Sequence, residues 1–136
     1  DSGSFGSATL EYMTDTQTFD LSLVTSGIAL DDLLGVGPNS TPIHIHNAPA
    51  GSNGGIAIDI GTMASFVDEG DGVLSFTLAG VSIGAFEDEL FAGDLYLNIH
   101  TQDYTGGEIR GQIVPAPGAG AFIGVCGLTL ARRKRQ

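Results

Sequence analysis

The stretch Pro42-Ile43-His44-Ile45-His46-Asn47 alternates branched apolar side chains with histidines. Successive side chains on a β-strand point to opposite faces, so Ile43 and Ile45 share one face and the two histidines share the other. The isoleucines are expected to face the core, because removing their apolar surface from water is favourable. The stretch therefore predicts a strand that carries two imidazoles on the face away from the core.

Two later stretches repeat this pattern. In residues 95–101 the apolar side chains share one face, and in residues 108–113 the isoleucines lie opposite Arg110. The polar face of the first of these stretches carries Tyr96, Asn98 and His100. The three histidines of the chain, and its only basic residue before position 132, thus all lie on polar faces of predicted strands. Any chemistry of the chain is expected there.

Further alternating runs, bounded by glycines or Asp-Gly steps, predict the remaining strands. They are residues 4–13, 18–24, 56–60 and 74–78. About seven or eight short strands with regular turns are typical of an all-β fold, a Greek-key β-sandwich or barrel. Residues 29–40 and 83–92 interrupt the pattern and are expected to be crossovers, the second with one or two helical turns.

The charge of the chain is unevenly distributed. The chain has 16 acidic and 5 basic residues, a net charge of -11, but four basic residues lie at positions 132–135. The part of the chain before position 132 contains all 16 acidic residues and one Lys or Arg, which is Arg110. Its net charge is therefore -15. Such a surface repels nucleic acid and anionic lipid and suits cations, high salt or basic partners, although solubility alone would also explain it. The single cysteine excludes an intramolecular disulfide, so cysteine usage does not indicate whether the protein works in an oxidising or a reducing compartment.

Residues 115–136 are expected to form a tail that is separate from a β domain of residues 1–114. The tail reads as a proline-rich break, an apolar run over residues 119–131, and a basic end. The residues that define the proline-rich break and the basic end are Val114, Pro115, Ala116, Pro117, Arg132, Arg133, Lys134 and Arg135. The run is short for a membrane helix, which needs about 20 residues, and the basic end would stay cytoplasmic. A buried C-terminal strand or helix is the alternative.

This tail resembles the PEP-CTERM sorting signals of bacterial exported proteins over residues 114–135, with Ala116 where the commonest form has glutamate. The resemblance implies an exported chain that is transiently anchored in the inner membrane. It also implies that an exosortase-type membrane protease processes the tail and leaves the protein at the cell surface or outside the cell. The start at Asp1, without a methionine, is consistent with a mature chain or with a shortened one.

The segments His44-Ile45-His46-Asn47-Ala48-Pro49-Ala50-Gly51, Leu95–Thr101 and Gly107-Glu108-Ile109-Arg110-Gly111-Gln112-Ile113 together resemble the CHRD domain, named for chordin. The resemblance spans residues 5–114, and its last segment is the most specific. It implies an extracellular all-β module, seen in chordins that bind growth factors and in many bacterial secreted proteins. It implies no reaction.

A second resemblance, to copper-zinc superoxide dismutases, concerns the basic residues. Those enzymes place a His-x-His on one strand, a third copper-binding histidine on a later strand, and then an arginine that guides the anion. The resemblance assigns His44, His46 and His100 to copper or zinc, and Arg110 to the anion. The expected Greek-key fold can then be immunoglobulin-like or superoxide-dismutase-like. The bridging histidine, the other zinc histidines and the disulfide have no counterpart, so copper binding without efficient dismutation is implied.

Each of these residues also has a plainer interpretation. The histidines can be surface groups bonded to loop backbone, and Arg110 can pair with Glu108, Asp103 or another carboxylate. The acidic run over residues 68–72 lacks the spacing of a twelve-residue calcium loop. The sequence contains no convincing catalytic triad or phosphate-binding loop.

We therefore expect an exported structural or adhesive module rather than an enzyme. Its expected partners are a protein or polysaccharide at the cell surface or in the extracellular matrix, or further copies of itself in an oligomer or filament. A metalloprotein that uses the three histidines, as a copper carrier or redox enzyme, is the alternative.

Overall fold

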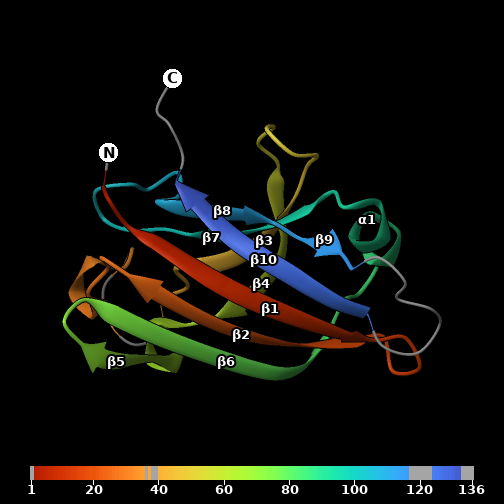
Figure 1. Cartoon of the computed structure of the whole chain (residues 1–136), viewed down its shortest axis with the longest axis horizontal. Coiled ribbons are helices and arrows are strands. Elements are labelled where there is room, and N and C mark those ends of the chain that lie inside the picture. Colours follow the sequence, from red (N-terminus) through yellow and green to blue (C-terminus); the bar gives the residue numbers. More distant parts are fainter. Residues whose placement is uncertain (1, 36, 38–39, 117–123, 133–136) are drawn as a thin grey trace.

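The computed structural model describes residues 2–35, 37, 40–116 and 124–132. Over these residues the chain forms two antiparallel four-stranded sheets, with a further strand joining them along one side (Figure 1). The predicted all-β sandwich is thereby confirmed. Strand order is β4-β3-β7-β8 in one sheet and β1-β2-β6-β5 in the other, with β10 between β8 and β1.

The first sheet consists of β4 (Gly55–Gly61), β3 (Ile43–Asn47), β7 (Leu95–Ile99) and β8 (Ile109–Gln112). The second consists of β1 (Phe5–Met13), β2 (Thr18–Ser26), β6 (Val73–Ser82) and β5 (Phe66–Gly70). The joining strand is β10 (Gly124–Arg132), which also pairs with the short β9 (Val114–Pro115). Two 3-10 turns, η1 (Leu30–Asp32) and η2 (Met63–Ser65), and one short helix, α1 (Glu87–Ala92), complete the described elements.

The core lies between the two sheets and is built from the alternating apolar positions of their strands. On β1 and β2 every second side chain is buried, as the sequence pattern predicts. On β3 and β7, however, both faces are buried, polar side chains included. The apolar faces pack in the core, with Ile43 and Ile45 fully buried. The polar faces are buried because loops of residues 48–54 and 101–107 bond to side chains on them.

The helical turn expected within residues 83–92 is α1. It ends at Gly93, whose φ of 76° is left-handed and therefore suits glycine. Leu90 is buried in the core, and Tyr12 of β1 donates a hydrogen bond of 2.5 Å to Glu87. Burial and the Glu87 carboxylate together raise the pKa of Tyr12. The helix is thus fastened to the second sheet.

Strand β5 is one of the described strands that the sequence pattern does not predict. It forms a hairpin with β6, in which the acidic run of residues 68–72 supplies the end of β5 and the turn, Asp71 and Gly72. Within this run Asp68 accepts a hydrogen bond from the Gly70 backbone, and Asp71 adopts a φ of 53°. The run therefore has a local structural role in the hairpin.

The C-terminal apolar run also contributes a strand. The backbone of β10 pairs antiparallel with β1 from Gly6 to Tyr12 and, at its far end, with β8. The sequence had favoured a separate tail over a strand. Pro117, Arg133, Lys134 and Arg135 lie outside the described residues, so the sorting and anchoring role stays a prediction.

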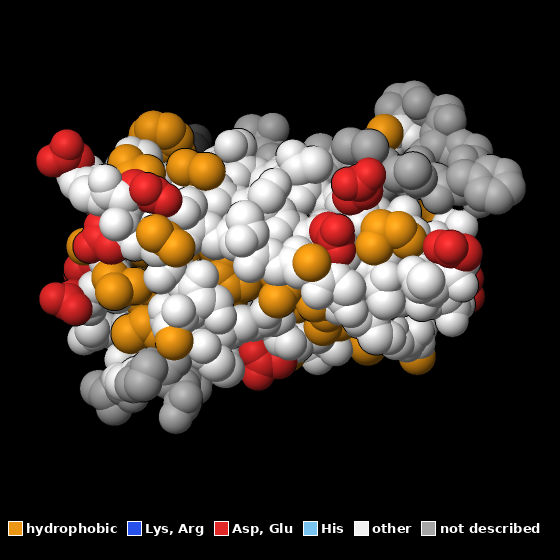
Figure 2. Space-filling view, turned by 90° about the horizontal axis from the view of Figure 1, so that it is seen from below, with side chains coloured by type: hydrophobic (Ala, Val, Ile, Leu, Met, Phe, Trp, Pro, Cys, Tyr) orange, Lys and Arg blue, Asp and Glu red, His pale blue; other side chains and the backbone are white. Residues whose placement is uncertain are grey.

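The part of the chain that the structure describes contains no helix long and apolar enough to cross a membrane. Viewed from below, acidic side chains are scattered over the surface among apolar and uncharged ones (Figure 2). This arrangement agrees with the acidic composition.

Candidate metal centre

The polar face of β3 and β7 brings the three histidines of the chain together. His44 and His46 lie on β3, and His100 directly follows β7. The two strands are antiparallel neighbours, with His44 opposite Asn98 and His46 opposite Tyr96. The His100 backbone N–H continues the pairing by donating to the Pro42 carbonyl at 2.8 Å. Strand register thus forms a three-histidine cluster, defined as His44, His46 and His100.

The three rings form a compact triangle. Ring centroids are 5.6 Å apart for His44 and His46, 4.9 Å for His44 and His100, and 5.6 Å for His46 and His100. Each ring offers one nitrogen, and these nitrogens all lie within 4.8 Å of one another. All three residues are buried, with 7–8 % of their surface exposed. This is the one group of potential metal ligands found among the described residues.

Loop carbonyls fix the tautomers of two of the rings. His46 Nδ1 lies 3.1 Å from the Gly54 carbonyl oxygen, and His100 Nδ1 lies 2.9 Å from that of Thr105. A carbonyl oxygen can only accept, so both Nδ1 atoms carry the proton and both Nε2 atoms have a free lone pair. These Nε2 atoms and His44 Nδ1 are buried and make no hydrogen bond. Buried polar atoms without partners are costly unless something binds them.

Two features of the surroundings favour ligation by His44. Its Nε2 lies 3.8 Å from the Asp59 carboxylate of β4, whereas the unpartnered nitrogen of the ring is Nδ1. A carboxylate behind a ligating histidine orients the ring and makes it a better donor. Burial first, and then the neighbouring His100, lower the pKa of His44, while the Asp59 carboxylate and a hydrogen bond with the Thr41 backbone act in the opposite direction. Burial also lowers the pKa of His46 and of His100. All three rings are therefore neutral at pH 7, the form that binds metals.

Tyr96 and Arg110 form a stack on His46. The Tyr96 ring lies parallel to His46, at an interplanar angle of 10° and a centroid distance of 5.0 Å. The Arg110 guanidinium lies 3.4 Å from the Tyr96 centroid. Because β7 lies between β3 and β8, the two groups reach Tyr96 from opposite sides. Arg110 is thus separated from the cluster by one aromatic ring, and the anion-guiding role stays a prediction.

The pairing of Arg110 with Glu108 is not among the contacts that the structure describes. Glu108 is buried and accepts hydrogen bonds from Ser4, at 2.5 Å, and from Thr101, at 2.6 Å. Arg110 instead donates to the amide oxygens of Asn53, at 3.3 Å, and Gln112, at 3.4 Å. Arg110 therefore links β8 to the loop that holds His46.

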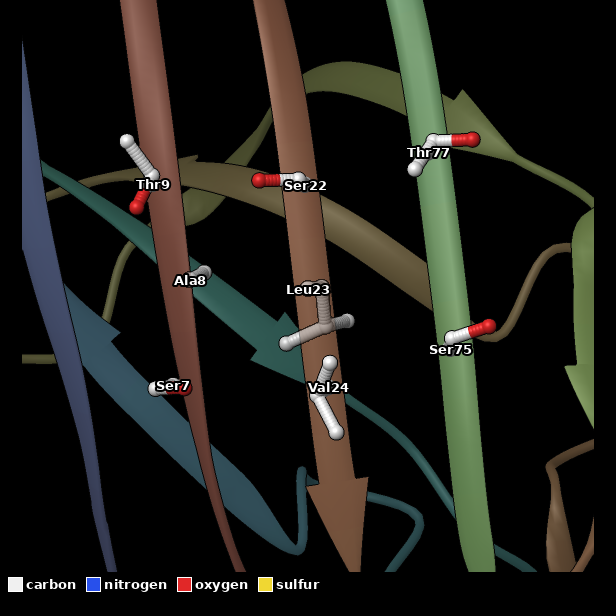
Figure 3. Close-up of a pocket in the computed structure, with 8 residues that line it drawn as sticks. All are labelled: Ser7, Ala8, Thr9, Ser22, Leu23, Val24, Ser75 and Thr77. Carbon is white, nitrogen blue, oxygen red and sulfur yellow. The ribbon is translucent and has the colours of Figure 1, made fainter. Parts of the chain in front are cut away.

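A shallow groove lies elsewhere, on β1, β2 and β6 (Figure 3). Its side chains include Ser7, Thr9, Ser22, Val24, Ser75 and Thr77. It offers hydroxyl groups but no titratable side chain. The three-histidine cluster is therefore the stronger candidate for chemistry.

Several residues of the centre had been assigned no role from the sequence. Tyr96 and Asn98 were placed on the polar face, but their partners belong to other segments. Gly54 is expected from the sequence only as a turn residue, and Asp59 and Thr105 give no signal, because a carboxylate in a strand and a loop carbonyl are common in any chain. Only the strand register and the folding of the loops bring them to the histidines.

The family model of the CHRD domain matches residues 1–113, which end directly before β9. No curated protein and no solved structure gave a match. The resemblances to sorting tails and to superoxide dismutases are not among these findings and stay predictions. CHRD domains are typically extracellular β-sandwich modules, which agrees with the two sheets described above. The family match covers most of the chain, and the chain therefore belongs to the CHRD domain family.

Proposed function

We propose that this chain is an exported CHRD module that binds one transition metal ion, copper or zinc, at His44, His46 and His100. The observation that carries the proposal is the convergence of three neutral imidazoles with unpartnered nitrogens in a buried place. A purely structural cluster would be expected to satisfy these nitrogens with hydrogen bonds.

The chemistry of the ligands selects among metals. Imidazole nitrogen suits copper and zinc, whereas calcium takes six to eight oxygen ligands. Metal–nitrogen distances of about 2.0–2.1 Å place ligating nitrogens about 3.5 Å apart. The nitrogens of the cluster lie within 4.8 Å of one another, so small side-chain movements would suffice to close around an ion. The carbonyls of Gly54 and Thr105 would keep the rings oriented during this movement.

Metal titration of tag-free protein tests the proposal. The chain should bind about one equivalent of copper or zinc, as measured by elemental analysis after gel filtration. The double variant His44→Ala/His100→Ala should lose it. Because the sequence contains only these three histidines, any imidazole-dependent binding reports on this cluster. An excess of calcium in the buffer controls for weak binding to the 16 carboxylates.

The outcome is decisive in either direction. Stoichiometric binding that is unchanged in the double variant would place the metal elsewhere. Absence of binding to the wild-type chain would leave the histidines as structural groups.

A structural or adhesive role is the second candidate, and the sheet ends favour it. Among the described strands, β4 and β5 each pair with one neighbour only. Each also exposes a large apolar side chain, Ile56 at 58 % and Val67 at 54 %. Sheet ends of this kind allow strand addition between copies or to a partner at the cell surface.

Light scattering across a range of concentrations, with and without calcium, tests self-assembly. The wild-type chain should form concentration-dependent oligomers, and Ile56→Lys or Val67→Lys should suppress them, because charges on an edge oppose strand pairing. A chain that stays monomeric throughout would contradict self-assembly.

Export and processing rest on the tail sequence alone. Val114, Pro115 and Ala116 would belong to the recognition segment of an exosortase-type protease, and the basic end would hold the chain at the inner membrane before release. Expression in a host with such a protease should yield a chain shortened near residue 114. Replacing Pro115 and Pro117 by alanine should prevent the shortening.

A further inference from the structure

We infer that the three-histidine cluster selects monovalent copper, Cu(I), over the divalent ions Zn(II) and Cu(II), an inference that rests on the proposed metal-binding function. Three features of the cluster carry it: the number of ligands, their burial, and the charge around them. Each feature involves only residues that precede the tail.

The first feature is the number of ligands. No further His, Cys, Asp or Glu joins the cluster in the described part of the chain. The nearest carboxylate described, Asp59, lies 3.8 Å from Nε2 of His44, whereas the unpartnered nitrogen of that ring is Nδ1. Zn(II) in proteins is almost always four-coordinate, and Cu(II) favours four or more ligands in tetragonal arrangements. Cu(I), a closed-shell monocation, is satisfied by three nitrogens in a plane.

The second feature is the burial of the ligands, which opposes a fourth ligand from solvent. The unpartnered nitrogens of all three rings are buried. The Tyr96 ring covers His46, and the loops that carry Gly54 and Thr105 hold the rings from outside. A dication would need a water or an anion to complete its coordination, and this arrangement does not favour the entry of either.

The third feature is charge. Imidazole binds a metal in its neutral form, so a dication would bring two uncompensated charges into a buried position, and the cost of burying an ion grows with the square of its charge. The Asp59 carboxylate compensates only in part, because its side chain is 55 % exposed. The Arg110 guanidinium on the far side of Tyr96 adds a positive charge. The electrostatic cost of placing an ion in this environment is lower for a monocation than for a dication.

Competition titrations test the inference on the whole chain. The affinity for Cu(I), measured anaerobically against a chromophoric Cu(I) chelator, should exceed the affinity for Zn(II) by at least about a hundredfold. X-ray absorption should show three nitrogens on Cu(I) and no fourth ligand. The reduction potential of the bound copper should lie above that of the aqueous Cu(II)/Cu(I) couple.

Variants at Arg110 test the charge contribution directly. Arg110→Gln should raise the affinity for both ions. Because a fixed charge acts on an ion in proportion to the charge of that ion, the factor for Zn(II) should be the square of the factor for Cu(I). Arg110→Lys keeps the charge and should leave the ratio of the two affinities unchanged. Circular dichroism and thermal unfolding establish that each variant is folded.

The possible results separate this inference from the proposed function. Zn(II) or Cu(II) bound as tightly as Cu(I), or an azide-sensitive fourth position on Cu(II), would overturn the selectivity while leaving metal binding intact. Failure of all three ions to bind would overturn the proposed function, and the selectivity with it.

Discussion

At the scale of single residues, His46 shows how the centre is held. Its Nδ1 donates to the Gly54 carbonyl, and its ring stacks on Tyr96. The Tyr96 hydroxyl in turn accepts a hydrogen bond of 3.1 Å from the Gly54 N–H. One glycine backbone thus fixes both the histidine and the ring that covers it. The orientation of the ligand depends on neighbours that would not contact the metal.

Replacing Tyr96 tests this dependence. Tyr96→Leu removes the stacked ring and the hydroxyl acceptor and should weaken copper binding by about 10–100-fold, the usual range for groups that orient a ligand. Tyr96→Phe keeps the ring and loses only the hydrogen bonds between the hydroxyl and the Gly54 backbone, so its effect should be smaller. Chelator competition gives the affinities, and the EPR hyperfine splitting of the Cu(II)-loaded protein reports whether the site geometry has changed. Equal affinities for the wild type and Tyr96→Leu would contradict the positioning role.

The metal-free protein should lose stability in mild acid because of the same histidines. Burial lowers their pKa below the ordinary value of 6.5, so the unfolded chain binds protons more readily than the folded one. The contribution of the three neutral histidines to the stability of the fold is complete above about pH 6.5, and it is lost as the pH falls below that value. The slope is at most about 1.4 kcal/mol per pH unit for each histidine.

Urea unfolding of the metal-free chain at pH 7.0 and pH 5.5 measures this loss. The triple variant His44→Gln/His46→Gln/His100→Gln should show a smaller difference between the two pH values. The Asp59 carboxylate opposes the effect at His44, whereas Arg110 adds to it at His46. An identical pH dependence in the triple variant would show that other groups are responsible.

At the scale of elements, the loops that cover β3 and β7 decide the site. The Gly54 backbone lies so close to Asn47 that an added Cβ would stand 1.7 Å from the Asn47 carbonyl oxygen. In the other loop, Gly107 has a φ of 108°, and a Cβ there would stand 2.0 Å from Asn98 Oδ1. Gly54 is therefore required by close packing against backbone, and Gly107 by its left-handed φ, and each belongs to a loop that bonds a histidine.

Neighbouring glycines provide a matched test. Gly54→Ala should destabilise the fold by about 2–4 kcal/mol and weaken metal binding, because the loop must move away from Asn47 and take its carbonyl away from His46. Gly55→Ala is the control, since a Cβ at position 55 meets nothing within 4 Å. Denaturant midpoints and metal titration should separate the two variants. Similar behaviour of both would contradict the close-packing explanation.

At the scale of the whole molecule, strand β10 lies outside the family match but pairs with strands inside it. The CHRD match ends at residue 113, but β10 from beyond it pairs with β1 over seven residues and connects the two sheets. Within the described chain, β1 without this strand would pair with β2 alone. The long edge of β1 would then be open to another chain.

Truncation after residue 116 tests the contribution of β10. The shortened chain should keep its β-sheet circular dichroism and its metal affinity, because the core and the three-histidine cluster belong to residues before the cut. Its thermal midpoint should fall, and in light scattering it should form larger oligomers than the full chain does at the same concentration. An unchanged midpoint and a monomeric state would support an independent domain of residues 1–114. Loss of all structure would make β10 part of the folding unit.

The sequence by itself determined the all-β class, most strands and the face on which each histidine lies. It could do so because alternation within a strand is local: Ile43 and Ile45 require a core face, and the side chains between them must point away. The helical turn before Gly93 was predictable for a similar local reason. The same rule placed Tyr96, Asn98 and Arg110 on polar faces.

Only the tertiary structure decided that these faces meet and are buried. The register of β3 against β7 sets His100 beside His44, and register depends on the fit of a whole sheet. The bonds from His46 to Gly54 and from His100 to Thr105 depend on how two loops fold back over the strands. The pairing of β10 with β1 joins segments more than a hundred residues apart. Such contacts are selected by packing of the complete chain, which no local pattern encodes.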